Sequence, residues 1–273
     1  MTEATNSYLD PIAFRLGGLS IHWYAIFIVG GAAIAVWIAS MEAKRIGEDS
    51  ENILDYVLIG LPMAIVGARL YYVLFNLPYY LTRPPHEMLA VWNGGLAIYG
   101  GLIGGIATLY YVAKKKKFSF LKYLDIMAPS VLFGQAAGRW GNFFNHEAHG
   151  GEVSREFLAD TLHLPNFIVE NMNINGVYYH PTFLYESVWN LIGFAILMIL
   201  RLKPGRFKEG QIISLMLAWY SFIRFFLEGM RTDSLYLFGN IRVSQVLSFV
   251  LFFAAIAAFV RFGKNKDYFE GKN

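Results

Sequence analysis

The sequence predicts an all-α integral membrane protein, a seven-helix transmembrane bundle with a small extracytoplasmic head segment. Three observations lead to this fold class. First, 56% of the 273 residues are hydrophobic and only 16% are charged, whereas soluble domains are about 25% charged, and the mean hydropathy is +0.40. Second, apolar runs recur at about the 20-residue length that a helix needs to cross a bilayer. Third, lysine and arginine gather in alternate connections between these runs.

We expect each apolar run to form one membrane-spanning helix. The approximate ranges are 19–39, 53–75, 96–113, 124–137, 183–200, 212–227 and 243–260. The fourth run is short and rich in small residues, which suits close packing inside a bundle. The sixth run contains charged residues, so its hydropathy alone would rank it lower. All of 1–273 is expected to form a single transmembrane domain.

The basic residues predict how these helices are oriented. Connections 1–2, 3–4 and 5–6 and the C-terminal tail hold 15 of the 23 Lys and Arg, and the opposite side holds six. Because cytoplasmic loops are enriched in Lys and Arg, the N-terminus is expected outside and the C-terminus in the cytoplasm. The polar segment 139–181 then lies outside as a head insertion. Within it, Asn175-Gly176 predicts a hairpin turn between 167–169 and 177–179.

Composition excludes several kinds of chemistry. The chain has no cysteine, so disulfides, thiolate metal sites and a thiol nucleophile of its own are excluded. The net charge of +3 is too small to indicate nucleic acid as a partner. His146, Glu147 and His149 are close in sequence, but their spacing is not typical of zinc, so neither a metal nor a cofactor is expected. No basic region precedes the first apolar run, so no cleaved signal peptide is expected.

The densest polar cluster, residues 138–150, directly follows the fourth apolar run. Arg139, Asn142, Asn145 and Glu147 are therefore expected at or just inside the outer membrane boundary. A guanidinium binds phosphate oxygens bidentately, asparagines can donate to ester or glycerol oxygens, and glycines allow the backbone close to a head group. The alternative is an ordinary interfacial loop in which Arg139 extends to water. The combination of these side chains in an apolar context favours a lipid head-group site.

A second cluster lies in the sixth apolar run. Tyr220, Arg224 and Glu228 are four residues apart, so they share one face of a helix. A charge near the middle of a span costs about 2.5–3.5 kcal/mol and usually faces a cavity or a partner. The alternative is a purely structural ion pair between Arg224 and Glu228. Intramembrane charges are more often functional, which favours a role in the site.

Smaller signals lie elsewhere. The glycines of 93–105 include Gly94, Gly101 and Gly105, whose small-xxx-small spacing favours tight helix packing, and the Tyr99 hydroxyl is expected among them near the outer surface. The stretch 22–24, His-Trp-Tyr, is consistent with an aromatic belt. Arg69 lies within the second run and needs a partner, for which Glu186 is a candidate. Lys114 to Lys117 are expected to anchor the third span at the cytoplasmic leaflet.

The 138–150 cluster resembles the signature of prolipoprotein diacylglyceryl transferases, Gly-Arg-x-Gly-Asn-Phe-x-Asn-x-Glu-x-x-Gly, and matches it at every fixed position. Supporting matches are His22-Trp23-Tyr24, Gly67 with Arg69, Gly94-Gly95-Leu96, His180-Pro181 with Tyr185-Glu186, Tyr220 with Arg224 and Glu228, and Ser244-Gln245. The resemblance implies a multi-pass enzyme of the bacterial cytoplasmic membrane. Its partners would be phosphatidylglycerol and preprolipoprotein signal peptides that carry a lipobox cysteine. It would move the diacylglyceryl group to that thiol, forming a thioether and releasing glycerol 1-phosphate, as the first step of lipoprotein maturation.

The resemblance also implies roles for individual residues. The catalytic residues would be Arg139, Arg224, Tyr99 and Glu147. The substrate-binding residues would be Arg139, Asn142, Asn145, Gly150, Tyr24, Tyr220, Glu228 and His180. The two arginines would stabilise the departing phosphate.

Tyr99 departs from the family, because many members have a histidine there that is proposed to take the thiol proton. A tyrosine titrates near pH 10 and is a poor base at neutral pH. Three possibilities follow: Tyr99 only orients the substrate, an adjacent arginine activates it, or the local positive field suffices to ionise the thiol, whose pKa is about 8.5 in free cysteine.

Two other functions stay open at this point. A lipid flippase could use the same arginines, but it would leave phosphatidylglycerol intact. Another phospholipid head-group enzyme would need clustered aspartates for a metal, whereas the spans offer little beyond Asp55 and Asp125.

Overall fold

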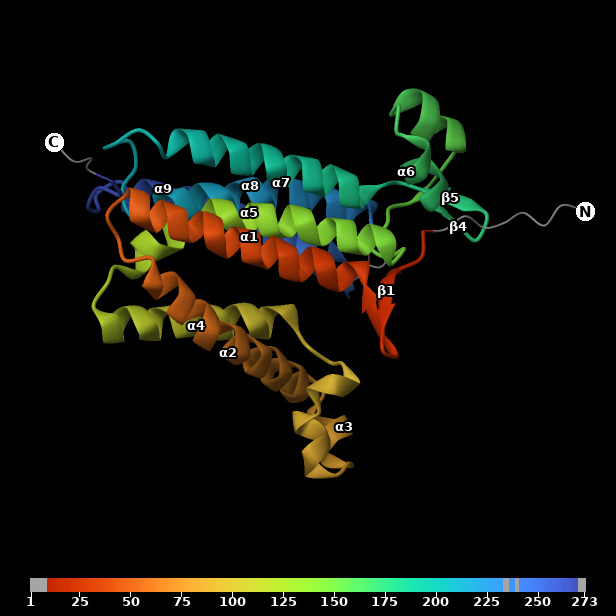
Figure 1. The fold of residues 1–273 in the computed structure, drawn as a ribbon, viewed down its shortest axis with the longest axis horizontal. Helices are drawn as coiled ribbons and strands as arrows, with labels where there is room; N and C mark the ends of the chain where they lie inside the picture. The colour runs from red at the N-terminus through yellow and green to blue at the C-terminus, as the bar shows by residue number, and fades with distance from the viewer. Residues whose placement is uncertain (1–8, 233–235, 239–240, 270–273) are drawn as a thin grey trace, which may run out of the picture. The chain divides into compact units, whose positions relative to one another are not determined.

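Seven helices of 19 residues or more organise the part of the chain that the structure, a computed structural model, describes: residues 9–232, 236–238 and 241–269 (Figure 1). These helices are α1 (Trp23–Arg45), α2 (Glu51–Phe75), α4 (Ile98–Lys116), α5 (Phe120–Phe144), α7 (Thr182–Leu200), α8 (Gln211–Met230) and α9 (Val243–Phe262). Each predicted apolar run overlaps one of them. The shorter elements are α3 (Leu77–Leu81), η1 (Pro85–Leu89), η2 (Val91–Asn93), β6 (Tyr236–Phe238) and β7 (Ile241–Arg242).

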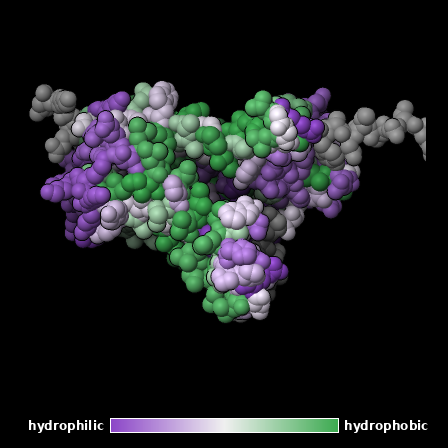
Figure 2. All heavy atoms as spheres, turned by 60° about the horizontal axis from the view of Figure 1, so that its bottom comes forward, coloured by the Kyte–Doolittle hydropathy of each residue, from purple (hydrophilic) through white to green (hydrophobic). Residues whose placement is uncertain are grey.

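The outer faces of these helices are apolar. Five of the helices in the described residues are long and apolar enough to cross a membrane: α1, α2, α7, α8 and α9. Large apolar side chains such as Leu58, Phe75 and Val260 are exposed on them, and much of the helix surface in view in Figure 2 is hydrophobic. Soluble monomers rarely expose apolar patches of this extent. The described residues are mostly helical. Their exposed apolar surface fits a multi-pass membrane protein.

The first predicted helix begins too early. Residues Leu19–His22 form β2, which pairs with β1 (Ile12–Leu16) in an antiparallel hairpin. Gly17 and Gly18 make the connection with φ of 53° and 87°, the positive values that a two-residue hairpin loop requires. Hydropathy placed these four residues in the span, but their alternation of apolar and polar side chains follows a strand.

The fourth helix is longer than predicted. α5 includes Asp125 near its start and Arg139 near its end, and both charges lower the hydropathy of the sequence. Inside the protein both are compensated, since Asp125 accepts hydrogen bonds from the Gly210 and Ile213 backbone N–H groups at 2.6 and 2.7 Å. These bonds cap the start of α8. The completely buried Asp125 therefore joins α5 to α8, the two helices that carry the arginines of interest.

The chain divides into two compact units, Met1–Ile38 with Leu124–Asn273, and Ala39–Tyr123. In the second unit, α2 and α4 pack with their backbones in close approach. A Cβ on Gly67 would lie 2.5 Å from the Gly100 carbonyl oxygen, and one on Gly104 would lie 2.6 Å from that of Met63. Small residues thus permit the tight packing that was expected. The prediction of the glycines themselves was off by one position, because Gly100 and Gly104 make the close approach, whereas Gly101 and Gly105 have only ordinary contacts.

In the first unit, the segment between α5 and α7 folds onto the ends of those helices. It holds β3 (Glu152–Val153), η3 (Phe157–Thr161), α6 (Asn166–Asn171), β4 (Asn173–Ile174) and β5 (Val177–Tyr179), with strand order β3-β5-β4. The hairpin at Asn175-Gly176 is confirmed, with φ of 54° and 87° at its two turn residues. The strand predicted at 167–169 was wrong. These residues lie in α6, which follows Pro165, a residue suited to a helix start.

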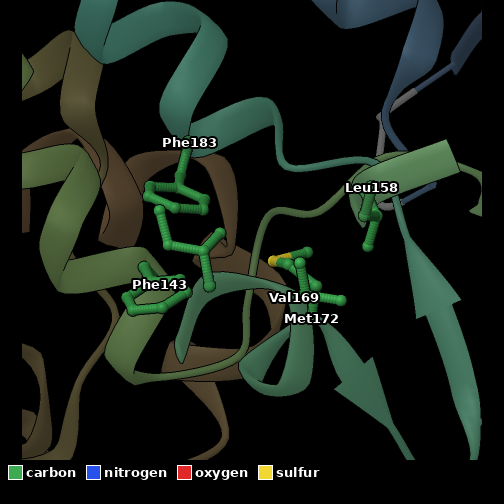
Figure 3. Packing of buried hydrophobic residues seen from close by; sticks show 6 residues of the cluster. Phe143, Leu158, Val169, Met172 and Phe183 are labelled. Carbon is green, nitrogen blue, oxygen red and sulfur yellow. The ribbon is translucent and has the colours of Figure 1, made fainter. Parts of the chain in front are cut away.

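A small apolar core fixes this segment to the helices. It consists of Phe143, Leu158, Ile168, Val169, Met172 and Phe183. Figure 3 shows Phe143 from α5 and Phe183 from α7 at one side of the cluster, Leu158 at the other side, and Val169 and Met172 between them. The two phenylalanine rings lie 4.5 Å apart. This core holds the end of α5, where the polar signature begins, against the start of α7.

Candidate active site

Four charged side chains meet where α5, α7 and α8 pack together. Glu186 of α7 lies between two arginines: its Oε1 accepts a hydrogen bond from Arg139 Nη2 at 2.8 Å, and its Oε2 lies 3.7 Å from Arg224 Nη1. On α8, Arg224 Nη2 lies 2.6 Å from a carboxylate oxygen of Glu228. The predicted i,i+4 pair of Arg224 and Glu228 is therefore present, and it is part of a larger cluster.

Burial differs between the acids and the bases of this cluster. The side chains of Glu186 and Glu228 are only 3% exposed, whereas the side chains of Arg139 and Arg224 are 18% and 16% exposed. Buried charges persist only where partners compensate them, and here two cations compensate two anions. The arginine side chains are therefore the more accessible part of the cluster.

A series of hydrogen bonds continues from Arg139 in α5 into residues 145–150, the signature loop. Arg139 Nη1 donates to Asn142 Oδ1 at 3.2 Å, and Asn142 Nδ2 donates to Glu147 Oε1 at 2.9 Å. Asn145 Nδ2 donates to the same carboxylate oxygen at 3.4 Å. Asn145 and Glu147 are exposed. The structure thus brings together the four polar residues that the sequence singled out in 138–150. The Glu147 carboxylate is the last acceptor in this series of hydrogen bonds.

The backbone of the signature loop is strained and anchored. His146 and Ala148 have φ of 54° and 58°, which L residues adopt at a cost and which often accompanies function. Asn171 is 1% exposed and holds the loop through two groups: its Nδ2 donates to the Phe143 carbonyl at 3.0 Å, and its Oδ1 lies 2.9 Å from His146 Nε2. The Leu9 backbone N–H also donates to Asn171.

A small pocket lies behind this loop. Its lining residues are Asn142, Phe143, His146, Glu147, Ala148, His149, Asn171, Met172, Ile174 and Phe183.

The described residues contain no group of three His, Asp or Glu side chains placed to hold a metal ion.

Two signature glycines allow close approach of other elements. A Cβ on Gly141 would lie 2.7 Å from the ring of Tyr24, the second residue of α1. A Cβ on Gly150 would lie 2.7 Å from that of His180, whose carbonyl accepts a hydrogen bond from the Gly150 N–H at 3.0 Å. Tyr24, Gly150 and His180 therefore pack around the signature loop.

His180 and Tyr220 complete the predicted set in the first unit. His180 Nδ1 lies 3.1 Å from the Tyr185 hydroxyl, and burial lowers the pKa of His180 below its usual value of 6.5, so the imidazole is neutral at pH 7. Tyr220 lies one helical turn before Arg224 on α8. The roles of His180 and Tyr220 in substrate binding stay predictions.

The second unit holds Tyr99 and Arg69. Tyr99 is the second residue of α4, is 40% exposed, and its ring centre lies 6.5 Å from that of Tyr71. Its role in catalysis stays a prediction. Arg69 is buried and donates to backbone carbonyls of Glu87, Met88, Gly94 and Gly95 at 2.6–3.1 Å. The predicted pairing of Arg69 with Glu186 was wrong, because carbonyls satisfy Arg69 and Glu186 is bound to the arginines of its own unit.

Two residues of the site, Glu186 and Asn171, were not predicted from the sequence to belong to it. Glu186 was named as part of a family match and as a candidate partner for Arg69, but it was given no role in the site, although a carboxylate in the second turn of an apolar helix indicates a nearby cation. Asn171 left no such signal, since an asparagine in a polar segment looks like a turn residue. Its anchoring role depends on contacts with residues 28 and 162 positions away.

Comparison with known proteins shows which family the chain resembles. The profile of the family Prolipoprotein diacylglyceryl transferase matches residues 11–261. A protein of Enterococcus faecalis named phosphatidylglycerol–prolipoprotein diacylglyceryl transferase is 56% identical over 91% of this chain and 88% of its own length. Proteins of the same name from Bacillus velezensis and Lactobacillus acidophilus are 50% and 47% identical, each over 98% of this chain and 97% and 96% of their own lengths. The chain belongs to the prolipoprotein diacylglyceryl transferase family.

Proposed function

We propose that this chain transfers the diacylglyceryl group of phosphatidylglycerol to the lipobox cysteine of preprolipoproteins. The cysteine sulfur bonds to the glyceryl carbon, and the bond from that carbon to the phosphate oxygen breaks. The electron pair leaves with the phosphate as glycerol 1-phosphate, and the thiol proton is released. Family membership and the names of the relatives support this reaction. Because the chain has no cysteine, the reacting thiol comes from the substrate.

One observation carries the chemistry: two arginines from different helices converge on one carboxylate. Arg139 of α5 and Arg224 of α8 both approach Glu186, so both can approach a phosphate that enters beside them. Two guanidinium groups there would stabilise the negative charge that develops on the leaving phosphate. Their partial exposure gives the head group access. We assign the binding of the phosphate to Arg139 and Arg224.

The chain of hydrogen bonds from Arg139 suggests where the glycerol head lies. Asn142, Asn145 and Glu147 offer amide donors and a carboxylate acceptor next to the phosphate position. Hydroxyl groups both donate and accept hydrogen bonds, so they suit such a set. We assign the terminal glycerol to these three residues. Asn142 then links the phosphate-binding arginine to the carboxylate Glu147.

The remaining predicted residues are assigned by their place. Tyr24, Gly150, Tyr220 and His180 shape the walls of the site, and Glu228 holds Arg224 by its ion pair. Tyr99 lies in the other unit, and its role rests on the family resemblance alone: we assign it as a hydrogen-bond donor that orients the cysteine.

We further propose seven membrane spans in the bacterial cytoplasmic membrane, with the N-terminus outside and the C-terminus in the cytoplasm. α4 has 19 residues and α5 has 25, both within the range of about 17–25 residues that transmembrane helices have. The last turns of α1, α4 and α9 all carry basic residues, as cytoplasmic ends do. The head insertion 139–181 then lies outside, in the single transmembrane domain 1–273.

The test is transfer by the purified chain. Phosphatidylglycerol labelled in its acyl chains and, separately, in its terminal glycerol is incubated with a lipobox peptide in detergent micelles. The expected products are a peptide heavier by one diacylglyceryl group and an equal amount of labelled glycerol 1-phosphate. A peptide with serine in place of cysteine is the control. In vesicles that contain the purified chain, labelled lipid that crosses the membrane while remaining intact would favour a flippase. In micelles, release of the terminal-glycerol label without a thioether would favour another head-group enzyme.

A further inference from the structure

Glu186 is the residue through which the two arginines are linked. We propose that Glu186 acts as an internal anion: its carboxylate stands in for the substrate phosphate, positions Arg139 and Arg224 before the lipid binds, and then opposes retention of the phosphate product. This makes Glu186 a positioning residue for both guanidinium groups. The proposal rests on the proposed function, because it assigns those groups to phosphate.

The geometry supports the placement. A carboxylate presents two oxygens to two cations, as a phosphate diester presents two non-bridging oxygens. Glu186 bonds Arg139 through Oε1 at 2.8 Å, but its Oε2 lies 3.7 Å from Arg224 Nη1, beyond hydrogen-bond range. Arg224 Nη1 is buried and makes no hydrogen bond within the described residues. A buried donor left unsatisfied costs free energy. A phosphate oxygen could accept a hydrogen bond from this nitrogen, whereas Glu186 Oε2 lies too far away to do so.

The charges support the second half of the proposal. Arg139, Arg224, Glu186 and Glu228 sum to zero when all are ionised. Any anion that enters therefore meets two cations and two buried carboxylates. Phosphatidylglycerol carries one negative charge at its phosphate, whereas a phosphate monoester carries up to two. Because Coulomb energies grow with the charge product, the repulsion from Glu186 is larger for the product than for the substrate, and it offsets part of the stronger attraction that the two arginines exert on the product.

Two substitutions separate charge from reach. Glu186→Gln keeps the length of the side chain and removes the charge, whereas Glu186→Asp keeps the charge and shortens the chain by one methylene, too short to reach both helices. Glu170→Gln is the matched control, since Glu170 is an exposed acid of the head that pairs with Arg155. The probe is sn-glycerol 1-phosphate, and its affinity is measured by thermal protection in detergent and by inhibition of transfer.

We expect Glu186→Gln to bind glycerol 1-phosphate about tenfold more tightly than the original chain, with a lower kcat from slower product release. Glu186→Asp should lose kcat and bind glycerol 1-phosphate no more tightly than the original chain, because the charge is kept while the arginines are no longer positioned together. Glu170→Gln should match the original chain in both measurements.

Three results would overturn the proposal: unchanged or weaker glycerol 1-phosphate binding in Glu186→Gln, a full kcat in Glu186→Asp, or a tenfold change in the Glu170→Gln control. The proposed function fails separately. A chain that transfers no lipid would refute the reaction, whereas an active chain whose Glu186→Gln variant binds the product as before would refute only the role of Glu186. Thermal protection needs no turnover, so a variant without activity still reports its affinity.

Discussion

Replacing Arg139 with lysine tests whether the site needs a guanidinium fork or only a positive charge. Arg139 uses two nitrogens at once, Nη2 on Glu186 at 2.8 Å and Nη1 on Asn142 at 3.2 Å. A lysine ammonium is a single point charge that cannot span both partners in that planar arrangement. It still compensates the buried Glu186 carboxylate. An alanine would leave that carboxylate uncompensated, which typically costs about 3–5 kcal/mol of stability and would confuse folding with catalysis.

The expected result for Arg139→Lys is a transfer rate lower by about 10²–10³, the typical loss of one transition-state donor, with normal purification and little change in thermal stability. The assay is turnover of phosphatidylglycerol with a lipobox peptide, alongside Tm in detergent. Arg155→Lys is the control, since Arg155 pairs with Glu170 on the exposed head, and it should keep full turnover. Turnover near that of the original chain in Arg139→Lys would refute the bidentate phosphate role. A fall in Tm that accounts for the whole loss would assign Arg139 to structure.

Three further predictions address the loop, the head and the topology. Gly150→Ala places a Cβ 2.7 Å from that of His180, so it should lower the stability by about 1–3 kcal/mol and reduce transfer with it; a Tm equal to that of the original chain would contradict the packing described. Because burial lowers the pKa of His180, folding favours the neutral imidazole, so this stability is fully present above pH 6.5 and is lost as the pH falls through the lowered pKa of the folded state. A Tm series from pH 7.5 to 5 (about two pH units around the pKa of free histidine) should show this loss in the original chain and less of it in His180→Gln; equal slopes would exclude His180 as its source. Single cysteines at the exposed positions Ser154 and Lys115 test the topology: an impermeant maleimide applied to intact cells should label Ser154→Cys and spare Lys115→Cys, and the reverse pattern would reject both the orientation and the outer location of the site.

The sequence predicted the elements that follow from local pattern. Apolar runs located the long helices because burial in lipid demands continuous apolar residues, and Asn175-Gly176 located its hairpin because few residues adopt positive φ at both turn positions. The same reasoning misplaced the start of α1 and the ends of α5. Hydropathy does not register that a charge such as Arg139, which lies just beyond the predicted end of α5, is compensated by Glu186 of another helix.

The candidate site was predictable in composition more than in connectivity. The signature and the i,i+4 spacing identified Arg139, Asn142, Glu147, Arg224 and Glu228. The resemblance implied that the two arginines act on one phosphate, but the acid that lies between them could not be predicted, because it depends on how α5, α7 and α8 pack. Glu186 was noticed for its charge and given the wrong partner, since sequence alone does not say which buried arginine faces which acid.

The central claim is that Arg139 and Arg224 act on one phosphate, and a double-mutant cycle tests it most directly. The measurement is kcat/KM for transfer by the original chain, Arg139→Lys, Arg224→Lys and the double variant. Residues that act as a unit show strongly non-additive losses. The account predicts that the double variant loses little more than either single variant, because removing one fork already disrupts binding of the shared phosphate. Losses that multiply in full would show that the two arginines act independently and would contradict the account.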